Sequence, residues 1–269
     1  MKNKSSYAEV NGLNMYYEVH GNGKPLVLLH GSFMTIALNF GKMIPAFARD
    51  RKVIAIEQQG HGHTEDIDRP VSYEQMADDT AELLQQLGIE KADILGYSLG
   101  GTTAIELAIR HPDRVRKLVV ISAPYKRDGW YPELFPTMES LTPEMLIGSG
   151  LPEAYADVAP NPDNWAKLVE KFKKLDVEYN GRTPEEFQSI KAPTLIMIGD
   201  SDAVPPKKAV EMFKLLGGGV FGDIVGLPRS QLAVIPGTTH AGIMERADWW
   251  SPMIKEFLDK PMKAAGTPK

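Results

Sequence analysis

Three side chains in this sequence could together activate an oxygen nucleophile. Ser98 lies within residues 96–100, which fit the pattern G-x-S-x-G, and Asp202 and His240 follow later in the chain. A serine hydroxyl is a weak nucleophile, so it needs a histidine as base, and the histidine needs a carboxylate to orient it. The order serine, acid, histidine is the one expected where a G-x-S-x-G turn carries the nucleophile. These residues therefore predict acyl transfer through a serine.

The acid of this trio has two candidates. Asp200 and Asp202 both follow the apolar segment 193–198, while His240 follows the apolar segment 232–235. Asp200 lies nearer the end of its segment, where an aspartate often shapes a turn with its own side chain. We therefore favour Asp202 as the acid, with Asp200 as the alternative.

Short apolar segments alternate with helical patterns along most of the chain. The predicted strands are 7–10 and 15–19, joined by Asn11-Gly12 as a hairpin, then 25–30, 52–56, 93–96, 117–121, 193–198 and 232–235. Helical patterns cover 73–87, 99–110, a segment after Pro206, and 248–258, and a Gly-rich loop is expected over 217–229. This alternation predicts an α/β fold with a mostly parallel central sheet of about eight strands flanked by helices. Ser98, Asp202 and His240 then all leave strands at the same edge.

Residues 124–190 interrupt this alternation. They contain no convincing strand but many apolar and aromatic residues, which a linker would lack. We expect a helical cap over 124–190 and a core formed by 1–123 and 191–269. The cap should lie over the carboxyl edge of the sheet, where open α/β folds bind ligands. Candidate pocket residues are Phe33, Tyr97, Trp130, Tyr131 and Phe135.

A tetrahedral intermediate on Ser98 would need two hydrogen-bond donors for its oxyanion. The backbone N–H of Leu99 is one candidate, because it directly follows the nucleophile. The second should come from the loop after His30-Gly31, with Ser32 preferred and Phe33 as the alternative. His30 itself is expected to brace this loop with a hydrogen bond.

Composition limits the remaining possibilities. The chain has 269 residues, 43% hydrophobic and 24% charged, with a net charge of −5 and no cysteine. These values are typical of a globular protein and give no basic patch for nucleic acid. Thiol catalysis and disulfides are excluded, and neither a signal peptide nor a membrane span is expected. We predict a cytoplasmic protein without cofactor or metal, acting on a small molecule; a homo-oligomer is possible.

Taken together, these motifs resemble the α/β-hydrolase superfamily, in particular serine esterases with a helical cap. The resemblance extends from His30-Gly31 to His240 and implies Ser98 as nucleophile, His240 as base and then acid, and Asp202 as its orienter. It also implies the amides of Ser32 and Leu99 as the oxyanion hole. Residues 60–64 resemble a loop that often reads Arg-Gly-x-Gly-x-Ser, but Gln59 replaces the arginine and Glu57 a common aspartate.

Alternatives remain for individual residues and for the function. His61 and His63 could suggest a metal, but two histidines without a third nearby ligand favour structural roles. The leading function is hydrolysis of a carboxylic ester with a small or medium, largely apolar substrate. The same triad could instead serve C–C bond cleavage, lactone opening or peracid formation, since a fold does not fix the substrate. A third reading is a ligand-sensing protein with slow hydrolysis.

Overall fold

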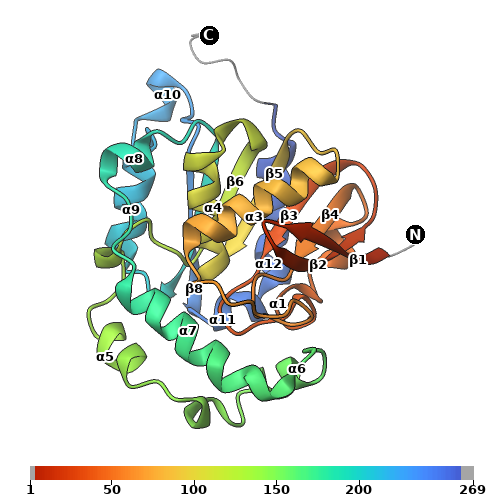
Figure 1. The fold of residues 1–269 in the computed structure, drawn as a ribbon. Helices are drawn as coiled ribbons and strands as arrows, with labels where there is room; N and C mark the ends of the chain where they lie inside the picture. The colour runs from red at the N-terminus through yellow and green to blue at the C-terminus, as the bar shows by residue number, and fades with distance from the viewer. Residues whose placement is uncertain (1–3, 262–269) are drawn as a thin grey trace.

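Eight strands form one sheet in the computed structural model, which describes residues 4–261 (Figure 1). The strands are β1 (Lys4–Val10), β2 (Leu13–His20), β3 (Lys24–Leu29), β4 (Arg51–Ile56), β5 (Ala92–Tyr97), β6 (Val115–Ile121), β7 (Thr194–Ser201) and β8 (Gln231–Thr239). Their order is β1-β2-β4-β3-β5-β6-β7-β8. β2 runs antiparallel to both its neighbours, and all pairs from β4 to β8 are parallel. The predicted mostly parallel sheet is confirmed.

The N-terminal hairpin forms at the predicted turn. Asn11 and Gly12 connect β1 to β2 with φ angles of 50° and 82°. A two-residue turn with both central residues at positive φ matches the right-handed twist of the flanking strands. Glycine and asparagine tolerate this conformation better than other residues do. The turn therefore sets the register of the hairpin, in which Val10 lies opposite Leu13.

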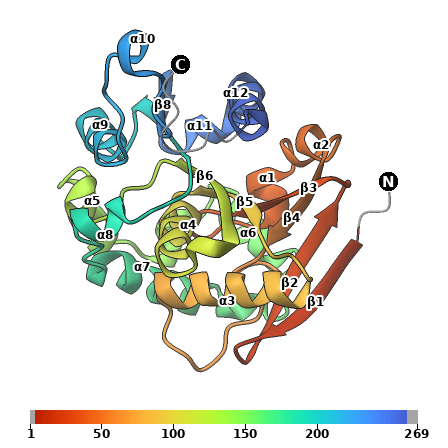
Figure 2. The ribbon, with the colours of Figure 1, turned by 90° about the horizontal axis from the view of Figure 1, so that it is seen from above.

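Helices cover both faces of the sheet (Figure 2). One face packs against α3 (Tyr73–Gln86), α4 (Leu99–Arg110) and α9 (Pro206–Leu215), and the other against α1 (Ile36–Phe40), α2 (Ile44–Phe47), α11 (Gly242–Glu245) and α12 (Ala247–Asp259). Side chains alternate between faces along a strand. In β3, Val27 and Leu29 join the first core, whereas Leu26 and Leu28 join the second. Burial on both faces explains the continuous apolar runs in the sequence.

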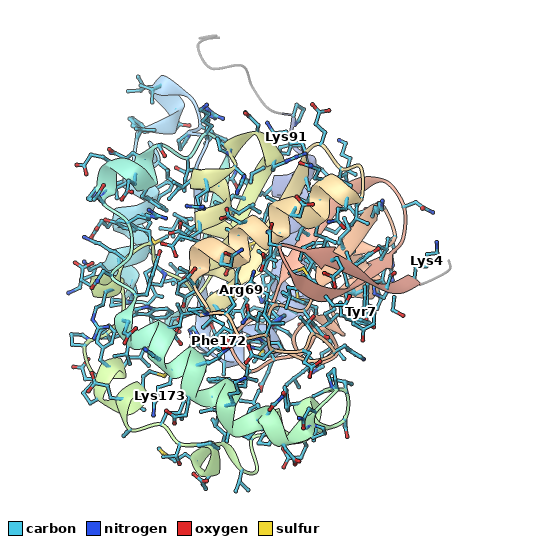
Figure 3. The ribbon with its side chains drawn as sticks, in the orientation of Figure 1. Lys4, Tyr7, Arg69, Lys91, Phe172 and Lys173 are labelled. Carbon is cyan, nitrogen blue, oxygen red and sulfur yellow. The ribbon has the colours of Figure 1, made fainter. Side chains whose placement is uncertain are left out.

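The segment between β6 and β7 forms a helical layer over the carboxyl edge of the sheet. Its α-helices are α5 (Leu134–Glu139), α6 (Leu151–Ala156), α7 (Trp165–Glu178) and α8 (Pro184–Gln188). The apolar face of α7 packs onto Leu99 and Phe33 of the sheet edge. Figure 3 shows Phe172 on this helix facing the core, with Lys173 beside it. Residues of this layer line the same cavity as Ser98.

The remaining helices are short. Four 3₁₀ helices cover Pro112–Arg114, Arg127–Gly129, Pro143–Leu146 and Pro162–Asn164, and α10 (Gly222–Val225) interrupts the predicted loop over 217–229. The predicted loop over 217–229 therefore contains one short helix. Its glycines permit the tight connections on either side of the single turn of α10. Within residues 4–261, every helix is too short or too polar to cross a lipid bilayer.

Strand β8 extends four residues beyond the predicted end at Ile235. Pro236 and Gly237 suggested a stop, because proline lacks the donor that a strand needs. The extension continues past an irregularity in the pairing with β7, and Ser201 pairs with Thr239 beyond it. His240 directly follows the end of this longer strand.

Candidate active site

Ser98 occupies a sharp turn between β5 and α4. Its φ and ψ angles are 52° and −118°, a combination that is strained for a residue with a side chain. A Cβ atom on Gly96 would lie 2.0 Å from the carbonyl oxygen of Gly100, and one on Gly100 would lie 2.0 Å from that of Leu29. The glycines on either side are thus required by close backbone approach. The turn presents Ser98 at the N-terminus of α4, where the helix dipole favours negative charge.

Replacing Gly100 with alanine should destabilise the fold, because the new methyl group would overlap the Leu29 carbonyl and neither backbone can move freely. We expect the free energy of unfolding to fall by about 3 kcal/mol, the upper part of the range for overpacking. Gly222→Ala is the matched control, since its Cβ would meet only the end of the Leu227 side chain at 3.3 Å. Urea unfolding of both variants measures the difference; equal stabilities would contradict the close approach.

Ser98, His240 and Asp202 form a continuous chain of hydrogen bonds. The Ser98 hydroxyl donates to Nε2 of His240 over 3.0 Å, and Nδ1 of His240 donates to Oδ1 of Asp202 over 2.9 Å. His240 follows the end of β8, and Asp202 follows the end of β7. The hydroxyl is thus in reach of a base whose tautomer is set by the carboxylate, which is the arrangement required to activate an oxygen nucleophile.

The Asp202 carboxylate is buried but fully hydrogen-bonded. Its side chain accepts hydrogen bonds from the Ser122 hydroxyl and from the backbone N–H groups of Gly199 and Val204, besides His240. Burial acts to raise the pKa of this carboxyl, but the hydrogen bond and charge of His240, with the donors from Ser122 and Gly199, outweigh burial and lower the pKa. Asp202 therefore remains an anion beside the imidazole.

Ser122 is a site residue that the sequence interpretation missed. It directly follows β6 and has a φ angle of 54°. Its backbone N–H bonds to Met197 of β7, while its hydroxyl reaches Asp202. A polar residue at the carboxyl end of a core strand was the available signal, because such residues meet at one edge of the sheet.

Asp200 forms no hydrogen bond with His240, which pairs with Asp202 instead. Its two carboxylate oxygens accept hydrogen bonds from the backbone N–H groups of Gly237 and Thr238 over 2.9 and 3.1 Å. These bonds lower the pKa of the exposed Asp200 carboxyl, and the bond from Gly237 has the largest effect. Asp200 therefore ties the end of β7 to β8 and so supports the strand that leads to His240.

The two loops beside Ser98 supply candidate donors for an oxyanion. The Phe33 backbone N–H donates to Nε2 of His61 over 3.0 Å, so it is already engaged. Within residues 4–261, no hydrogen-bond partner is present for the backbone N–H of Ser32 or of Leu99. Both residues line the same cavity as Ser98. This difference separates Ser32 from Phe33, the two alternatives that the sequence left open.

Buried histidines fix the loop that contains Ser32. Nδ1 of His30 donates to the Gly31 carbonyl, and Nε2 accepts from the Gln58 backbone N–H. Desolvation by burial lowers the pKa of His30, and lowers that of His61 well below its usual value, so both rings are neutral and can accept. The loop is thereby tied to the neighbouring loop after β4.

His61 and His63 point to different partners. His61 accepts a hydrogen bond from the Phe33 backbone N–H, whereas both the backbone N–H and the ring Nδ1 of His63 bond to Glu57. The other carboxylate oxygen of Glu57 accepts from the Ile36 backbone N–H. The hydrogen bond to Glu57 is the main cause that raises the pKa of His63. Through these hydrogen bonds, both histidines and Glu57 stabilise the loops around the site.

A cavity of about 250 Å³ lies above Ser98. Four of the five predicted pocket residues line it: Phe33, Tyr97, Trp130 and Phe135. The Trp130 ring lies edge-on to the His240 ring, with 5.7 Å between the ring centres. The Tyr97 hydroxyl donates to the His240 backbone carbonyl over 3.0 Å. Leu134 and Met138 of α5 add apolar surface that the sequence interpretation did not single out.

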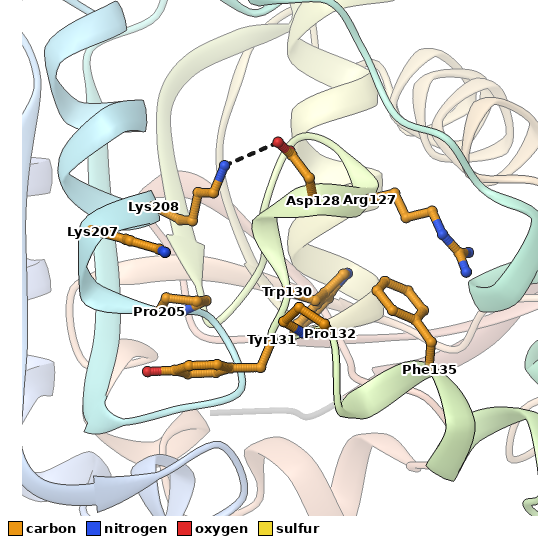
Figure 4. A pocket seen from close by; sticks show the side chains of 9 residues that line it. All are labelled: Arg127, Asp128, Trp130, Tyr131, Pro132, Phe135, Pro205, Lys207 and Lys208. Carbon is orange, nitrogen blue, oxygen red and sulfur yellow. Dashed lines mark hydrogen bonds and ion pairs between the residues drawn. The ribbon is translucent and has the colours of Figure 1, made fainter.

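Tyr131 lies elsewhere. Its backbone N–H bonds to Ala203, and its side chain, 44% exposed, lines a neighbouring pocket on the outer surface (Figure 4). Trp130 and Phe135 line both pockets and therefore stand between them. Adjacent residues in extended backbone point to opposite sides, so Trp130 facing inward directs Tyr131 outward.

Asp176 of α7 brings a carboxylate to the same cavity. Its Oδ1 accepts from the Tyr73 hydroxyl over 2.5 Å. Desolvation by burial raises the pKa of Asp176 to about 6, although the Tyr73 hydrogen bond and the His240 charge act in the opposite direction. Nothing in the sequence marked this residue, because the packing of α7 alone decides which of its polar side chains reaches the cavity.

The raised pKa predicts a pH-dependent cost of ionising Asp176 in the folded protein. At pH values between the ordinary pKa of an aspartate and about 6, the folded state binds more protons than the unfolded state. The free energy of unfolding therefore falls as the pH rises. Asp176→Asn lacks this titration. Relative to that variant, the wild type should lose about 2 kcal/mol of unfolding free energy between pH 4.5 and 7.5. Urea unfolding at both pH values tests this; a pH-independent difference would contradict it.

Comparisons with known proteins show which family the chain belongs to. The family model described as alpha/beta hydrolase fold matches residues 24–164, just over half of the chain. The chain is 28% identical to a putative carbamate hydrolase RutD from Azorhizobium caulinodans, over 93% of this chain and 97% of that protein. It is 29% identical to a pimeloyl-(acyl-carrier protein) methyl ester esterase from Vibrio atlanticus, over 91% and 98%.

A solved structure shows the same fold. The enol-lactonase from Burkholderia xenovorans superposes with a TM-score of 0.72 and 22% identity, covering 94% of this chain and all of that one. Together with the matched family model and the eight-stranded sheet, this likeness covers both the strands and the inserted helices. The chain is a hydrolase that belongs to the α/β hydrolase fold family.

Proposed function

We propose that this protein hydrolyses carboxylic esters of small to medium, largely apolar substrates through an acyl-enzyme on Ser98. The observation that carries the proposal is the hydrogen-bonded chain Ser98–His240–Asp202 beside an apolar cavity. The cavity of about 250 Å³ is small for a ligand site, which favours a small acyl or alcohol group.

The reaction follows from the atoms at the site. His240 Nε2 takes the proton as Ser98 Oγ attacks the ester carbonyl, and Asp202 stabilises the imidazolium that forms. The backbone N–H groups of Leu99 and Ser32 receive the developing oxyanion. His240 then gives the proton to the departing alcohol. Water attacks the acyl-enzyme with His240 again as base, and His240 returns the proton to Ser98 Oγ as the bond between Oγ and the acyl carbon breaks and the carboxylic acid leaves. Two easier steps replace one difficult step.

The inserted helices have a proposed role as well. We assign residues 124–190 to a cap that supplies the upper wall of the pocket, and 1–123 with 191–269 to a core that carries the triad. Trp130, Leu134, Phe135 and Met138 of the inserted segment line the cavity, whereas Ser98, Asp202 and His240 follow core strands. Bond cleavage would then depend on the core, and substrate choice on the cap together with the core residues that line the pocket.

The bond that is cleaved needs a direct test, because the relatives are named for carbamate, methyl ester and enol-lactone substrates. Specificity constants for short p-nitrophenyl esters, carbamates, lactones and vinylogous diketones would be compared at one pH. We expect the highest kcat/KM for an ester with a short acyl chain. A higher value for a lactone, carbamate or diketone would transfer the proposal to that bond. Turnover below one per minute on the whole panel would favour a ligand sensor.

A further inference from the structure

Helix α7 directs one acidic side chain into the active-site cavity. Asp176 follows Phe172 by four residues, so the two side chains share the face of α7 that packs against the core. Phe172 is completely buried against the His61 ring, at 4.5 Å between ring centres. A carboxylate on this face is therefore placed among apolar side chains and lines the cavity with Ser98 and His240.

A hydrogen bond from Tyr73 orients the Asp176 carboxylate. Tyr73, 4% exposed, donates its hydroxyl proton to Oδ1. The Tyr73 ring packs against that of Tyr179 at 4.5 Å, and the Tyr179 hydroxyl donates to Glu106 over 2.7 Å. Glu106 is in turn paired with Arg182. Several contacts thus hold the hydroxyl that holds the carboxylate, as expected for a preorganised binding group.

Asp176 has no cationic partner. Within residues 4–261, no lysine, arginine or histidine forms an ion pair with it, and Oδ2 accepts no hydrogen bond from the protein. Asp66, by contrast, does have such partners, because it pairs with Lys167 and Lys171 of α7. A carboxylate in an apolar site is costly unless it is paired. A ligand that supplied a cation would provide the missing partner.

We propose that Asp176 is a specificity-determining residue that binds a protonated amino group of the substrate and excludes substrates with a carboxylate at that position. This inference rests on the proposed function, because it takes the cavity above Ser98 as the substrate pocket. The ammonium group would donate to Oδ2, while the ester carbonyl lies at Ser98 and the apolar walls hold the carbon chain between them. A carboxylate would instead meet like charge and an acceptor with no donor.

Binding of three matched small molecules tests the proposal without requiring turnover. Dissociation constants for butylammonium, butyramide and butanoate would be measured at pH 7.5 by ligand-observed NMR titration. The proteins are the wild type, Asp176→Asn, Tyr73→Phe, and Asp163→Asn, which changes an exposed acid of the same segment. Asp176→Asn keeps the shape of the side chain and an oxygen for the Tyr73 hydroxyl. Circular dichroism checks that every variant folds.

We expect the wild type and Asp163→Asn to bind butylammonium at least tenfold tighter than butanoate, with butyramide between them. Asp176→Asn should remove this preference, while Tyr73→Phe should reduce it, because the Tyr73 hydrogen bond orients the carboxylate and keeps its pKa lower. No preference in the wild type, or an unchanged preference in Asp176→Asn, would overturn the proposal.

Hydrolysis of p-nitrophenyl acetate by the same preparations keeps the two proposals separate. Absence of hydrolysis in the wild type would contradict the proposed function, whereas the binding constants would still report on Asp176. Conversely, hydrolysis with no charge preference would leave the function and remove the specificity assignment.

Discussion

Replacing Ser98 with alanine is expected to lower kcat/KM for a short p-nitrophenyl ester by at least about 10⁴-fold. The hydroxyl that donates to His240 over 3.0 Å is removed, so no acyl-enzyme can form at this position. Alanine retains the Cβ atom and needs the same positive φ, so the thermal unfolding temperature should change little.

Ser140→Ala is the control for the Ser98 variant. Ser140 is exposed on the inserted segment, and among residues 4–261 its hydroxyl bonds only to the Thr137 carbonyl. This change should leave kcat/KM within about twofold, as for most surface substitutions. Equal activities of the Ser98 and Ser140 variants would exclude Ser98 as the nucleophile.

Replacing Asp202 with asparagine should lower kcat by about 10⁴-fold. The asparagine amide can present its NH₂ group to Nδ1 of His240, which then favours the tautomer whose Nε2 carries the proton and cannot accept from Ser98. The Ser122 hydroxyl and the Gly199 N–H would also lose a charged acceptor. Initial-rate kinetics with the ester that gives the highest kcat/KM measure the effect.

Asp200→Asn makes the same chemical change two residues away. Asp200 bonds to Gly237 and Thr238 rather than to His240, and an asparagine retains one acceptor oxygen for these two donors. The loss of one hydrogen bond is worth about 1 kcal/mol, so kcat should stay within about tenfold. If the Asp200 variant lost more activity than the Asp202 variant, the orienting acid would be assigned to Asp200.

The triad was accessible to sequence reasoning because its members have positions that the fold fixes. Ser98 lies in a turn that close backbone approach restricts to flanking glycines. Asp202 and His240 each follow a core strand, and parallel strands bring their carboxyl ends to one edge. Backbone topology alone therefore predicts that the three side chains are near one another, while the hydrogen bonds of 2.9 and 3.0 Å come from the structure.

The wall of the pocket was less accessible because it depends on side-chain packing between distant segments. Tyr131 and Trp130 are adjacent aromatic residues, yet only Trp130 lines the cavity above Ser98. Asp176 is one of several charged residues on α7, and its position is set by how α7 packs on Tyr73 and His61. Helical periodicity gives a face but not what that face meets.

The central claim, that Ser98 is the nucleophile, is tested most directly by locating a covalent adduct. The folded protein would be treated with a fluorophosphonate, which traps an activated serine, and then digested and analysed by peptide mass spectrometry. We predict one adduct, on the peptide and residue Ser98, with loss of esterase activity in proportion to labelling and no labelling in Ser98→Ala. Labelling of another residue such as Ser122, or full activity after Ser98 is labelled, would contradict the claim.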